Sequence, residues 1–353
     1  MRQSEWQDAV ITQGRDTRWC VPDLLSDAFP PLPEEPLMTA STTRRTTAAR
    51  SRIAAVGAIA VAGALILTGC GDQTEGNGSS DSGKTDNSAP LFSKLPKKIQ
   101  DAGVIKVGSD TAYAPMEFVD GGKIVGVDPD IAEALGKQLG VKFQFTSGTF
   151  DGLITSLETG RQDIAMSSIT DNKKRQEGLD DKGQKIGKGV DFVDYFSSGV
   201  SLLVKKGNPQ NIKSLDDLCG KTVAVQRGTT YEDTFKAQAE KCGDKKLTIE
   251  AFDTDAEAQT RVKAGGAVAD LNDFPVTAYT AKTSGGGNDF EVGGAQADVG
   301  LFGIAVSKEN TQLRDALKEA LDAIIKDGSY AKVLEKWNVK DSAVQSATIN
   351  AGK

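Results

Sequence analysis

The turn "QRGTTYED" has the residue types of an anion-binding site. Gly228, Thr229 and Thr230 follow a run of strand-forming residues and precede a predicted helix. The first N–H groups of a helix have no intrahelical partner and attract anions, and a glycine lets the backbone approach a ligand closely. The same residues are also typical of an ordinary helix N-cap. The sequence therefore leaves anion binding and capping open at this turn.

The residue types that most often catalyse reactions at neutral pH are sparse. None of the 353 residues is a histidine, which removes the commonest general base and the commonest zinc ligand. The four cysteines, at positions 20, 70, 219 and 242, have no CxxC spacing, so we expect neither a zinc ribbon nor a redox motif. A formal net charge of −7 argues against a nucleic-acid-binding protein. Catalysis by carboxylates, lysine or cysteine stays possible, but we predict a protein that is not an enzyme and that needs no metal or cofactor.

The segment around Cys70 has the chemistry of a membrane attachment point. A stretch with four arginines and no acid (38–52) precedes an apolar run (53–68), which is the order found in a signal peptide. The residues "LTGC" that end at Cys70 resemble the lipobox of bacterial lipoproteins. This resemblance implies that the Cys70 thiol receives a diacylglyceryl group and that cleavage removes the signal peptide, residues 38–69; two acyl chains then anchor the protein stably. A buried alanine-rich helix is the alternative, although the run lacks the polar stripe of a core helix.

Composition divides the rest of the chain. We expect residues 1–37 to be a non-native or mis-assigned extension and the true start to be Met38. Residues 70–94 are rich in Ser, Gly, Asp and Asn and are predicted to form a flexible tether behind the lipidated cysteine. From residue 95 onward, strand and helix patterns alternate, which predicts an α/β fold with largely parallel strands. One of these helices is expected over 128–140, with Asp128 as its N-cap.

Cys219 and Cys242 flank one strand–loop–helix unit. Outside the cytoplasm such a pair is expected to be oxidised, so we predict a disulfide. Two separate buried thiols are the alternative.

From residue 94 to residue 339 the chain resembles an extracytoplasmic solute-binding protein of the polar amino acid family, bacterial solute-binding protein family 3. The resemblance depends on the order of several segments, among them "VGSDTAYAPMEF", "FDGLITSLETGRQDIAMSS", "SLDDLCGKTVAVQRGTT" and "DLNDFPVTAY". It implies a two-lobed periplasmic-binding-protein fold of type II, with two crossover strands as the hinge and the ligand in the cleft. The expected parts are lobe 1 over 95–197 plus 300–340, lobe 2 over 198–299, and a C-terminal tail over 341–353.

The same resemblance implies which residues bind the carboxylate of a free amino acid. Arg175 would bind it, because a guanidinium pairs bidentately with a carboxylate. Thr170, Thr229 and Thr230 would add hydroxyl and backbone donors. Ser168 would offer a backbone group near the ammonium. From the residues alone, the "KKR" that contains Arg175 is more usually a solvated basic helix face.

The ammonium and the side chain of the ligand are assigned in the same way. Asp273 matches the acid that receives the α-ammonium. Asp270 is the competing candidate, and we interpret it as structural because the family segment usually has an apolar strand residue there. Tyr113 and Phe150 match the two aromatics that sandwich the ligand side chain, although lone aromatic residues more often belong to a core.

Asp110 bears on the choice of ligand. Its carboxylate would accept a hydrogen bond from a side-chain amide or guanidinium of the ligand. The alternative is that Asp110 only caps its loop. Gln226 lies where some glutamine binders have lysine. With Asp110 and no matching cation, the pocket suits Arg, Lys or Gln better than Glu or Asp.

The predicted function is that of a monomeric, lipid-anchored receptor on the outer face of the cytoplasmic membrane of a Gram-positive bacterium. It would capture a polar amino acid by hinge closure and deliver it to the permease subunits of an ABC transporter, without contact to nucleic acid. One alternative is a lyase similar to cyclohexadienyl dehydratase, with Glu117 as the nearest proton donor. Another is a sensor module that reports amino acids to a membrane partner.

Overall fold

The computed structural model describes residues 85–353, except for the side chains of residues 295–298. The predicted extension 1–37, the signal peptide and Cys70 lie outside the described residues. The strands are β1 (Val104–Ser109), β2 (Ala112–Tyr113), β3 (Glu117–Asp120), β4 (Lys123–Val125), β5 (Lys142–Ser147), β6 (Ile164–Ala165), β7 (Val190–Lys205), β8 (Thr222–Gln226), β9 (Thr248–Phe252), β10 (Ala269–Asp273), β11 (Phe290–Ser307) and β12 (Thr348–Ile349). The α-helices are α1 (Lys97–Ala102), α2 (Val127–Leu139), α3 (Leu153–Glu158), α4 (Lys173–Glu177), α5 (Thr230–Cys242), α6 (Asp255–Lys263), α7 (Phe274–Thr283), α8 (Thr311–Asp327) and α9 (Ser329–Lys336). The short 3₁₀ helices are η1 (Phe92–Lys94), η2 (Phe150–Gly152), η3 (Leu215–Leu218), η4 (Ser284–Gly286) and η5 (Lys340–Ser342).

The main sheet has the strand order β5-β1-β6-β11-β7-β10-β8-β9, and β12 adds to β7. We call the half that contains β5, β1 and β6 lobe 1, and the half that contains β10, β8 and β9 lobe 2. Within the lobes, β1 runs parallel to β5 and β6, and β8 runs parallel to β9 and β10. The three short strands β2, β3 and β4 form a separate antiparallel sheet.

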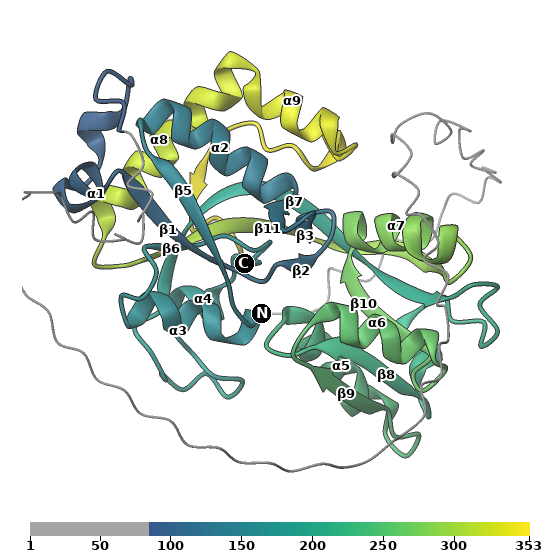
Figure 1. The fold of residues 1–353 in the computed structure, drawn as a ribbon. Helices are drawn as coiled ribbons and strands as arrows, with labels where there is room; N and C mark the ends of the chain where they lie inside the picture. Colours follow the sequence, from purple (N-terminus) through teal and green to yellow (C-terminus); the bar gives the residue numbers. More distant parts are fainter. Residues whose placement is uncertain (1–84) are drawn as a thin grey trace, which may run out of the picture. The chain divides into compact units, whose positions relative to one another are not determined.

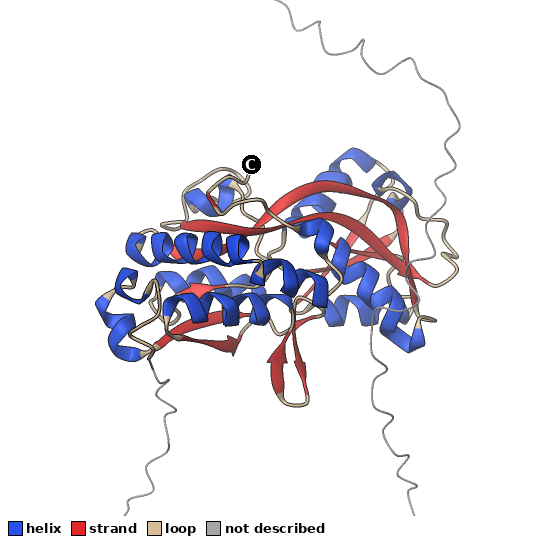
Figure 2. Ribbon diagram, turned by 90° about the horizontal axis from the view of Figure 1, so that it is seen from above, coloured by secondary structure: helices blue, strands red, loops and turns tan. Residues whose placement is uncertain are grey.

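The antiparallel strands β7 and β11 connect the lobes, because each is long enough to belong to both (Figure 1). The start of β7 pairs with β12, whereas its last part pairs with β10 in lobe 2. The end of β11 pairs with β6 in lobe 1. Figure 2 shows the two strands passing from one half into the other. The predicted α/β fold with two crossover strands is therefore confirmed.

Each lobe has its own apolar core. In lobe 1, α2, α8 and α9 pack on one another and on the sheet. The buried positions of α8, from Leu313 to Ile324, recur every three or four residues, which is the pattern of a helix with one apolar face. In lobe 2, α5 packs against β8 and β9, with the fully buried Phe235 in its centre. Each such fully buried large side chain contributes about 1.5–3 kcal/mol of transfer free energy.

The ordered body begins before the predicted end of the tether. The Asp86 N–H donates to the Gly140 carbonyl at 2.9 Å, and the Leu91 N–H donates to the Gln138 carbonyl at 3.0 Å. Leu91 and Phe92 pack against the core of lobe 1. The prediction of a flexible tether is thus wrong for residues 86–94, because these two apolar side chains hold the segment on the end of α2.

Cys219 and Cys242 form the predicted disulfide, with their Cα atoms 5.3 Å apart. The bond joins the residue after η3 to the last residue of α5 and so fastens this helix to lobe 2. Among the described residues no helix is both long and apolar enough to cross a membrane.

Candidate functional site

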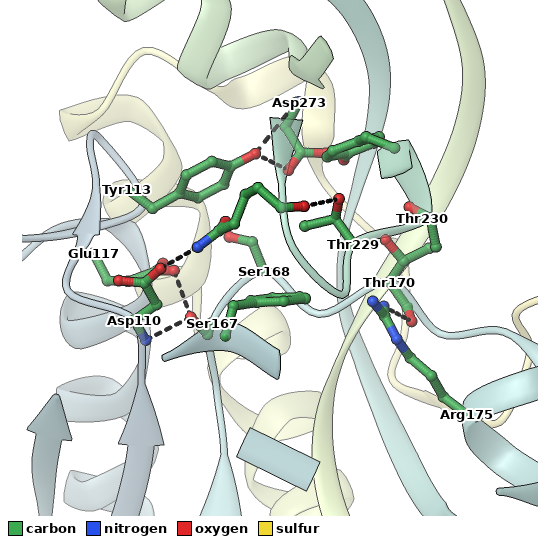
Figure 3. A pocket seen from close by; sticks show the side chains of 13 residues that line it. Asp110, Tyr113, Glu117, Ser167, Ser168, Thr170, Arg175, Thr229, Thr230 and Asp273 are labelled. Atoms are coloured by element: carbon green, nitrogen blue, oxygen red, sulfur yellow. Dashed lines mark hydrogen bonds between the residues drawn. The ribbon is translucent and has the colours of Figure 1, made fainter. Parts of the chain in front are cut away.

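One cavity lies where residues of the two lobes meet, and all nine predicted ligand-binding residues line it (Figure 3). Lobe 1 contributes Asp110, Tyr113, Glu117, Phe150, Ser167, Ser168, Thr170 and Arg175, and lobe 2 contributes Gln226, Thr229, Thr230, Tyr231 and Asp273. The cavity leaves little room, because side chains from the two lobes already bond to one another across it.

Asp273 ends strand β10 and is only 2% exposed. Tyr113 from lobe 1 donates its hydroxyl to Asp273 Oδ2 at 2.6 Å, and Tyr231 from α5 donates to Oδ1. Burial raises the pKa of Asp273 to about 7, and the two tyrosine hydroxyls oppose this rise. An ionised carboxylate has about four acceptor positions, so two hydroxyls leave room for the N–H donors of an ammonium.

Arg175 lies on α4 in lobe 1, which starts at the N-cap Asn172. Its Nη1 donates to the Thr170 carbonyl at 2.8 Å, and its Nη2 donates to the Gly228 carbonyl of lobe 2 at 3.1 Å. The guanidinium also lies over the Phe150 ring, 5.4 Å from its centroid. Burial lowers the pKa of Arg175 to about 10, which leaves it charged at neutral pH. The guanidinium therefore places a fixed cation at one end of the cavity. The alternative interpretation, in which Arg175 belongs to a solvated helix face, is wrong.

The turn at Gly228 combines both interpretations of its sequence. Thr229 is the N-cap of α5 and accepts from the Glu232 N–H at 3.2 Å, while its own hydroxyl donates to the Gln226 carbonyl at 2.8 Å. Gly228 has a positive φ of 76°, and a Cβ there would lie 2.9 Å from the Asp151 Cβ of lobe 1. A glycine is needed because its φ is positive and the backbone of one lobe lies close to Asp151 of the other. Capping and a position on the cavity thus coexist in the same turn.

Asp110 and Gln226 meet at the other end of the cavity, one from each lobe. The Gln226 amide donates to Asp110 Oδ2 and, at 3.3 Å, to the Asp253 carbonyl. Burial raises the pKa of Asp110, and the Gln226 hydrogen bond opposes the rise. The Asp110 N–H donates to the Ser167 hydroxyl at 2.9 Å, which in turn donates to Glu117 at 2.8 Å. The carboxyl groups here face polar donors and no cation among the described residues that line this end.

Glu117, which lines the cavity, forms a buried acid pair with Asp128, which does not. Burial and the nearby Asp128 charge raise the pKa of Glu117 well above its ordinary value, which favours the neutral form of this carboxyl group. Asp128 accepts from the Tyr195 hydroxyl at 2.7 Å and from the Ser168 N–H at 3.1 Å. Ser168 itself has a positive φ of 49°, and its buried hydroxyl lacks a hydrogen-bond partner within the described part of the chain. Asp128 lies inside α2, whose N-cap is Gly126, so the prediction of Asp128 as the N-cap is wrong.

Asp270 does not line the cavity. It accepts from the Asn272 amide at 2.7 Å and from the Leu271 N–H at 2.9 Å, and it is paired with Asp255 of α6. Sequence reasoning missed Tyr231 and Ser167. Tyr231 is an aromatic residue in a polar turn, the same signal that selected Tyr113, whereas Ser167 has no local signal.

Further contacts join the lobes beside the cavity. Lys174 on α4 bonds to Asp233 on α5 at 2.8 Å, and Phe118 on β3 lies 6.3 Å from the Tyr279 ring on α7. The lobes are therefore also in contact outside the cavity. The described residues contain no cluster of side chains suited to hold a metal ion.

The sequence of this chain is similar to those of known proteins. Residues 105–340 match the family of bacterial extracellular solute-binding proteins, family 3. The arginine-binding protein ArgT of Corynebacterium glutamicum is 30% identical over 261 residues, which cover 72% of this chain and 81% of ArgT. The L-cystine-binding protein TcyJ of Escherichia coli strain K12 is 30% identical over 246 residues, which cover 69% of this chain and 85% of TcyJ.

Two solved structures show the same fold. An ancestral arginine-binding protein bound to arginine has 36% sequence identity and a TM-score of 0.59, with coverage of 67% of this chain and 98% of that protein. The ancestral amino acid-binding protein AncCDT-1, described as a precursor of cyclohexadienyl dehydratase, has 38% identity and a TM-score of 0.59, with coverage of 68% and 97%. These relatives are binding proteins, and the second shows that the fold also leads to an enzyme. The chain belongs to the bacterial extracellular solute-binding proteins of family 3, and its relatives bind amino acids.

Proposed function

We propose that this protein is a receptor that captures a cationic amino acid between its lobes and delivers it to an ABC permease. The observation that carries the proposal is the placement of Arg175 and Asp273 on one cavity, from opposite lobes. A free amino acid is a zwitterion, so its carboxylate would pair with Arg175 while its ammonium pairs with Asp273. Because each end of the ligand would contact a different lobe, binding would favour the closed arrangement.

The charges of the cavity support a cationic side chain. Arg175 is the cation among the described lining residues, and the acids are Asp110, Glu117 and Asp273. Arg175 and Asp273 would be paired with the backbone groups of the ligand, and the raised pKa of Glu117 favours its neutral form, so Asp110 would be left to accept a hydrogen bond from the ligand side chain. A guanidinium or ammonium would gain a charge-assisted hydrogen bond there, whereas a glutamate side chain would be repelled. Tyr113 and Phe150 would provide the apolar walls in between.

We further propose that the receptor is attached through Cys70 to the outer face of the cytoplasmic membrane. The support is the basic, apolar and "LTGC" order in residues 38–70. The body would then be held near its permease by residues 71–85, a shorter tether than the sequence predicted. Mass analysis of Cys70 in cells, before and after globomycin-type inhibition of the lipoprotein peptidase, tests this attachment independently of ligand binding.

Calorimetric titration with L-arginine, L-lysine, L-glutamine and L-glutamate tests the ligand class. We expect the two cationic amino acids to bind most tightly, glutamine more weakly and glutamate not measurably. The isosteric Asp110→Asn variant removes the distal charge and is expected to weaken arginine binding at least about tenfold while changing glutamine binding little. Absence of binding for every amino acid would overturn the proposal. Equal losses for arginine and glutamine in the variant would overturn the role of Asp110.

A further inference from the structure

Helix α4 carries Arg175 but is only five residues long. A helix of this length is not stable by itself, so its position depends on tertiary contacts. Asn172 caps it by accepting from the Arg175 N–H at 2.8 Å. The other buried contact is made by Gln176, whose amide donates to Asp171 Oδ1 at 2.7 Å. The orientation of Arg175 therefore depends on how Asp171 and Gln176 are held.

A segment from the end of the chain, Thr348–Gly352, lies against these residues, and we call it the C-terminal strap. Its first two residues form β12 and pair with Asp194 and Val193 of the crossover strand β7. The Asn350 side chain continues the attachment, because its Oδ1 accepts from the Phe192 N–H at 2.8 Å. The strap is thus fixed to the hinge strand by backbone and side-chain bonds.

The strap ends on Asp171. The Gly352 N–H donates to Asp171 Oδ2 at 2.6 Å, and the Gly352 carbonyl accepts from the Gln176 amide at 3.4 Å. Gly352 is buried, and a Cβ on it would overlap the backbone carbonyl of Asp171. Thr170, the neighbour of Asp171, supplies the carbonyl that accepts from Arg175 Nη1. A continuous chain of contacts therefore leads from Gly352 to the guanidinium.

The strap also supplies donors to a second buried acid. Asp194 accepts from the Thr348 hydroxyl at 2.7 Å and from the Ala351 N–H at 3.2 Å. Asp171 lies close enough to Asp194 to add to the rise in its pKa, which burial dominates. Without the strap, two neighbouring buried carboxyl groups would lose most of their donors, and the Asp171 backbone would have to shift to let water reach them.

We propose that the C-terminal strap is a positioning element for Arg175, which sets how well the receptor holds the carboxylate of its ligand. The match to the family ends at residue 340, so the strap lies outside the matched region. The inference rests on the proposed amino acid binding, because Arg175 needs a carboxylate to act on. The strap residues touch no ligand in this scheme. They act through Asp171, Gln176 and the backbone of Thr170.

The test compares two ligands that differ only at the carboxylate, L-arginine and L-argininamide, by calorimetry on the full-length chain. The wild-type protein is expected to prefer arginine at least about tenfold. In Gly352→Ala, the added methyl group displaces the strap from Asp171, and we expect this preference to fall about fivefold, with argininamide affinity nearly unchanged. The matched control is Lys353→Ala, an exposed neighbour, which should leave both affinities as they are.

Two further variants separate positioning from general loosening. Leu321→Val shortens a fully buried side chain of α8 and lowers stability without touching α4, so it should not change the preference. Asp171→Asn replaces an acceptor of the strap without added bulk and should reduce the preference in the same direction, which keeps the test valid if Gly352→Ala does not fold. In the Arg175→Ala background, Gly352→Ala should have no additional effect on the preference.

The outcomes are distinct. A preference that is unchanged in both Gly352→Ala and Asp171→Asn, or an equal loss for both ligands, overturns the positioning role while the receptor function stands. A wild-type protein that binds neither ligand nor any other amino acid overturns the receptor function, and the inference falls with it.

Discussion

Asp270 and Asp273 lie three residues apart on β10, and they are 0% and 2% exposed. Both are buried carboxyl groups of lobe 2, and both have a pKa raised above its ordinary value, chiefly by burial. They differ in their neighbours. Asp273 ends the strand at the cavity and accepts from two tyrosine hydroxyls. Asp270 lies within the strand, beside the carboxyl group of Asp255.

The comparison shows that burial alone does not decide whether a carboxyl group lies at the cavity. Repulsion from Asp255 adds to the rise in the Asp270 pKa and so favours the neutral form of Asp270, while its oxygens accept hydrogen bonds from Leu271 and Asn272. A neutral carboxyl group whose oxygens already accept hydrogen bonds attracts an ammonium only weakly. Tyrosine hydroxyls instead donate to Asp273 and favour its charged form, so a cation can still be attracted.

The largest expected effect is a contrast between two isosteric variants. Asp273→Asn should weaken L-arginine binding at least about 100-fold, because it removes the charge that pairs with the ammonium. Asp270→Asn should change the affinity less than about threefold, because this residue does not reach the cavity. Calorimetry on both proteins checks the contrast, with circular dichroism as the control for folding. Similar losses of L-arginine affinity in the two variants would contradict the distinction between Asp273 and Asp270.

The pH dependence of affinity gives the next largest effect. Asp273 has a pKa of about 7 before ligand binds, and the ammonium needs the ionised form. The ionised fraction falls about tenfold between pH 8 and pH 6, so the affinity for L-arginine should fall by about the same factor as the pH is lowered. Titrations at several pH values check the slope. Asp270→Asn should keep this slope, and a flat profile in the wild-type protein would mean that Asp273 is already ionised throughout.

Removal of one hydroxyl should have a smaller effect. Tyr231→Phe deletes a donor that stabilises the Asp273 charge, so we expect the affinity at pH 7 to fall several-fold, about three- to tenfold, and its decline on acidification to begin at a higher pH. Tyr330→Phe is the matched control, because its buried hydroxyl donates to the Tyr195 carbonyl, away from the cavity. It should lower the melting temperature without changing the affinity. Equal affinities for the two variants would argue against a role for the Tyr231 hydroxyl.

The cavity residues that sequence could identify are those within recognisable local segments. Arg175 and Asp273 each belong to such a segment, and the structure brings them to one cavity. The sequence around Asp128 predicts a helix cap, whereas its actual partners, Ser168 and Tyr195, are 40 and 67 residues away and leave no local pattern.

The fold was predictable to a similar extent. Alternating strand and helix patterns and the order of the family segments were enough to predict two lobes joined by two strands. The paired tail was not predictable, since β12 is only two residues long and owes its structure to β7 and to buried carboxyl groups elsewhere in the chain. The start of the body was missed because two apolar residues, Leu91 and Phe92, in an otherwise polar region are sufficient to hold it.

The smallest expected effect concerns stability. Burial raises the pKa of Asp255 to about 6 and raises the pKa of Asp270 well above the value near 4 of an unfolded aspartate. Groups with a raised pKa in the folded state contribute stability that is complete below pH 4 and is lost as the pH rises through the folded pKa. The ligand-free protein should therefore melt at a lower temperature at pH 8 than at pH 5.

Asp270→Asn introduces an amide that can donate to Asp255 without taking up a proton. The stability of this variant should therefore match that of the wild type at pH 5 and exceed it at pH 8. Scanning calorimetry at the two pH values checks the difference, and a variant that loses as much stability as the wild type over this range would mean that the Asp255–Asp270 pair does not share a proton.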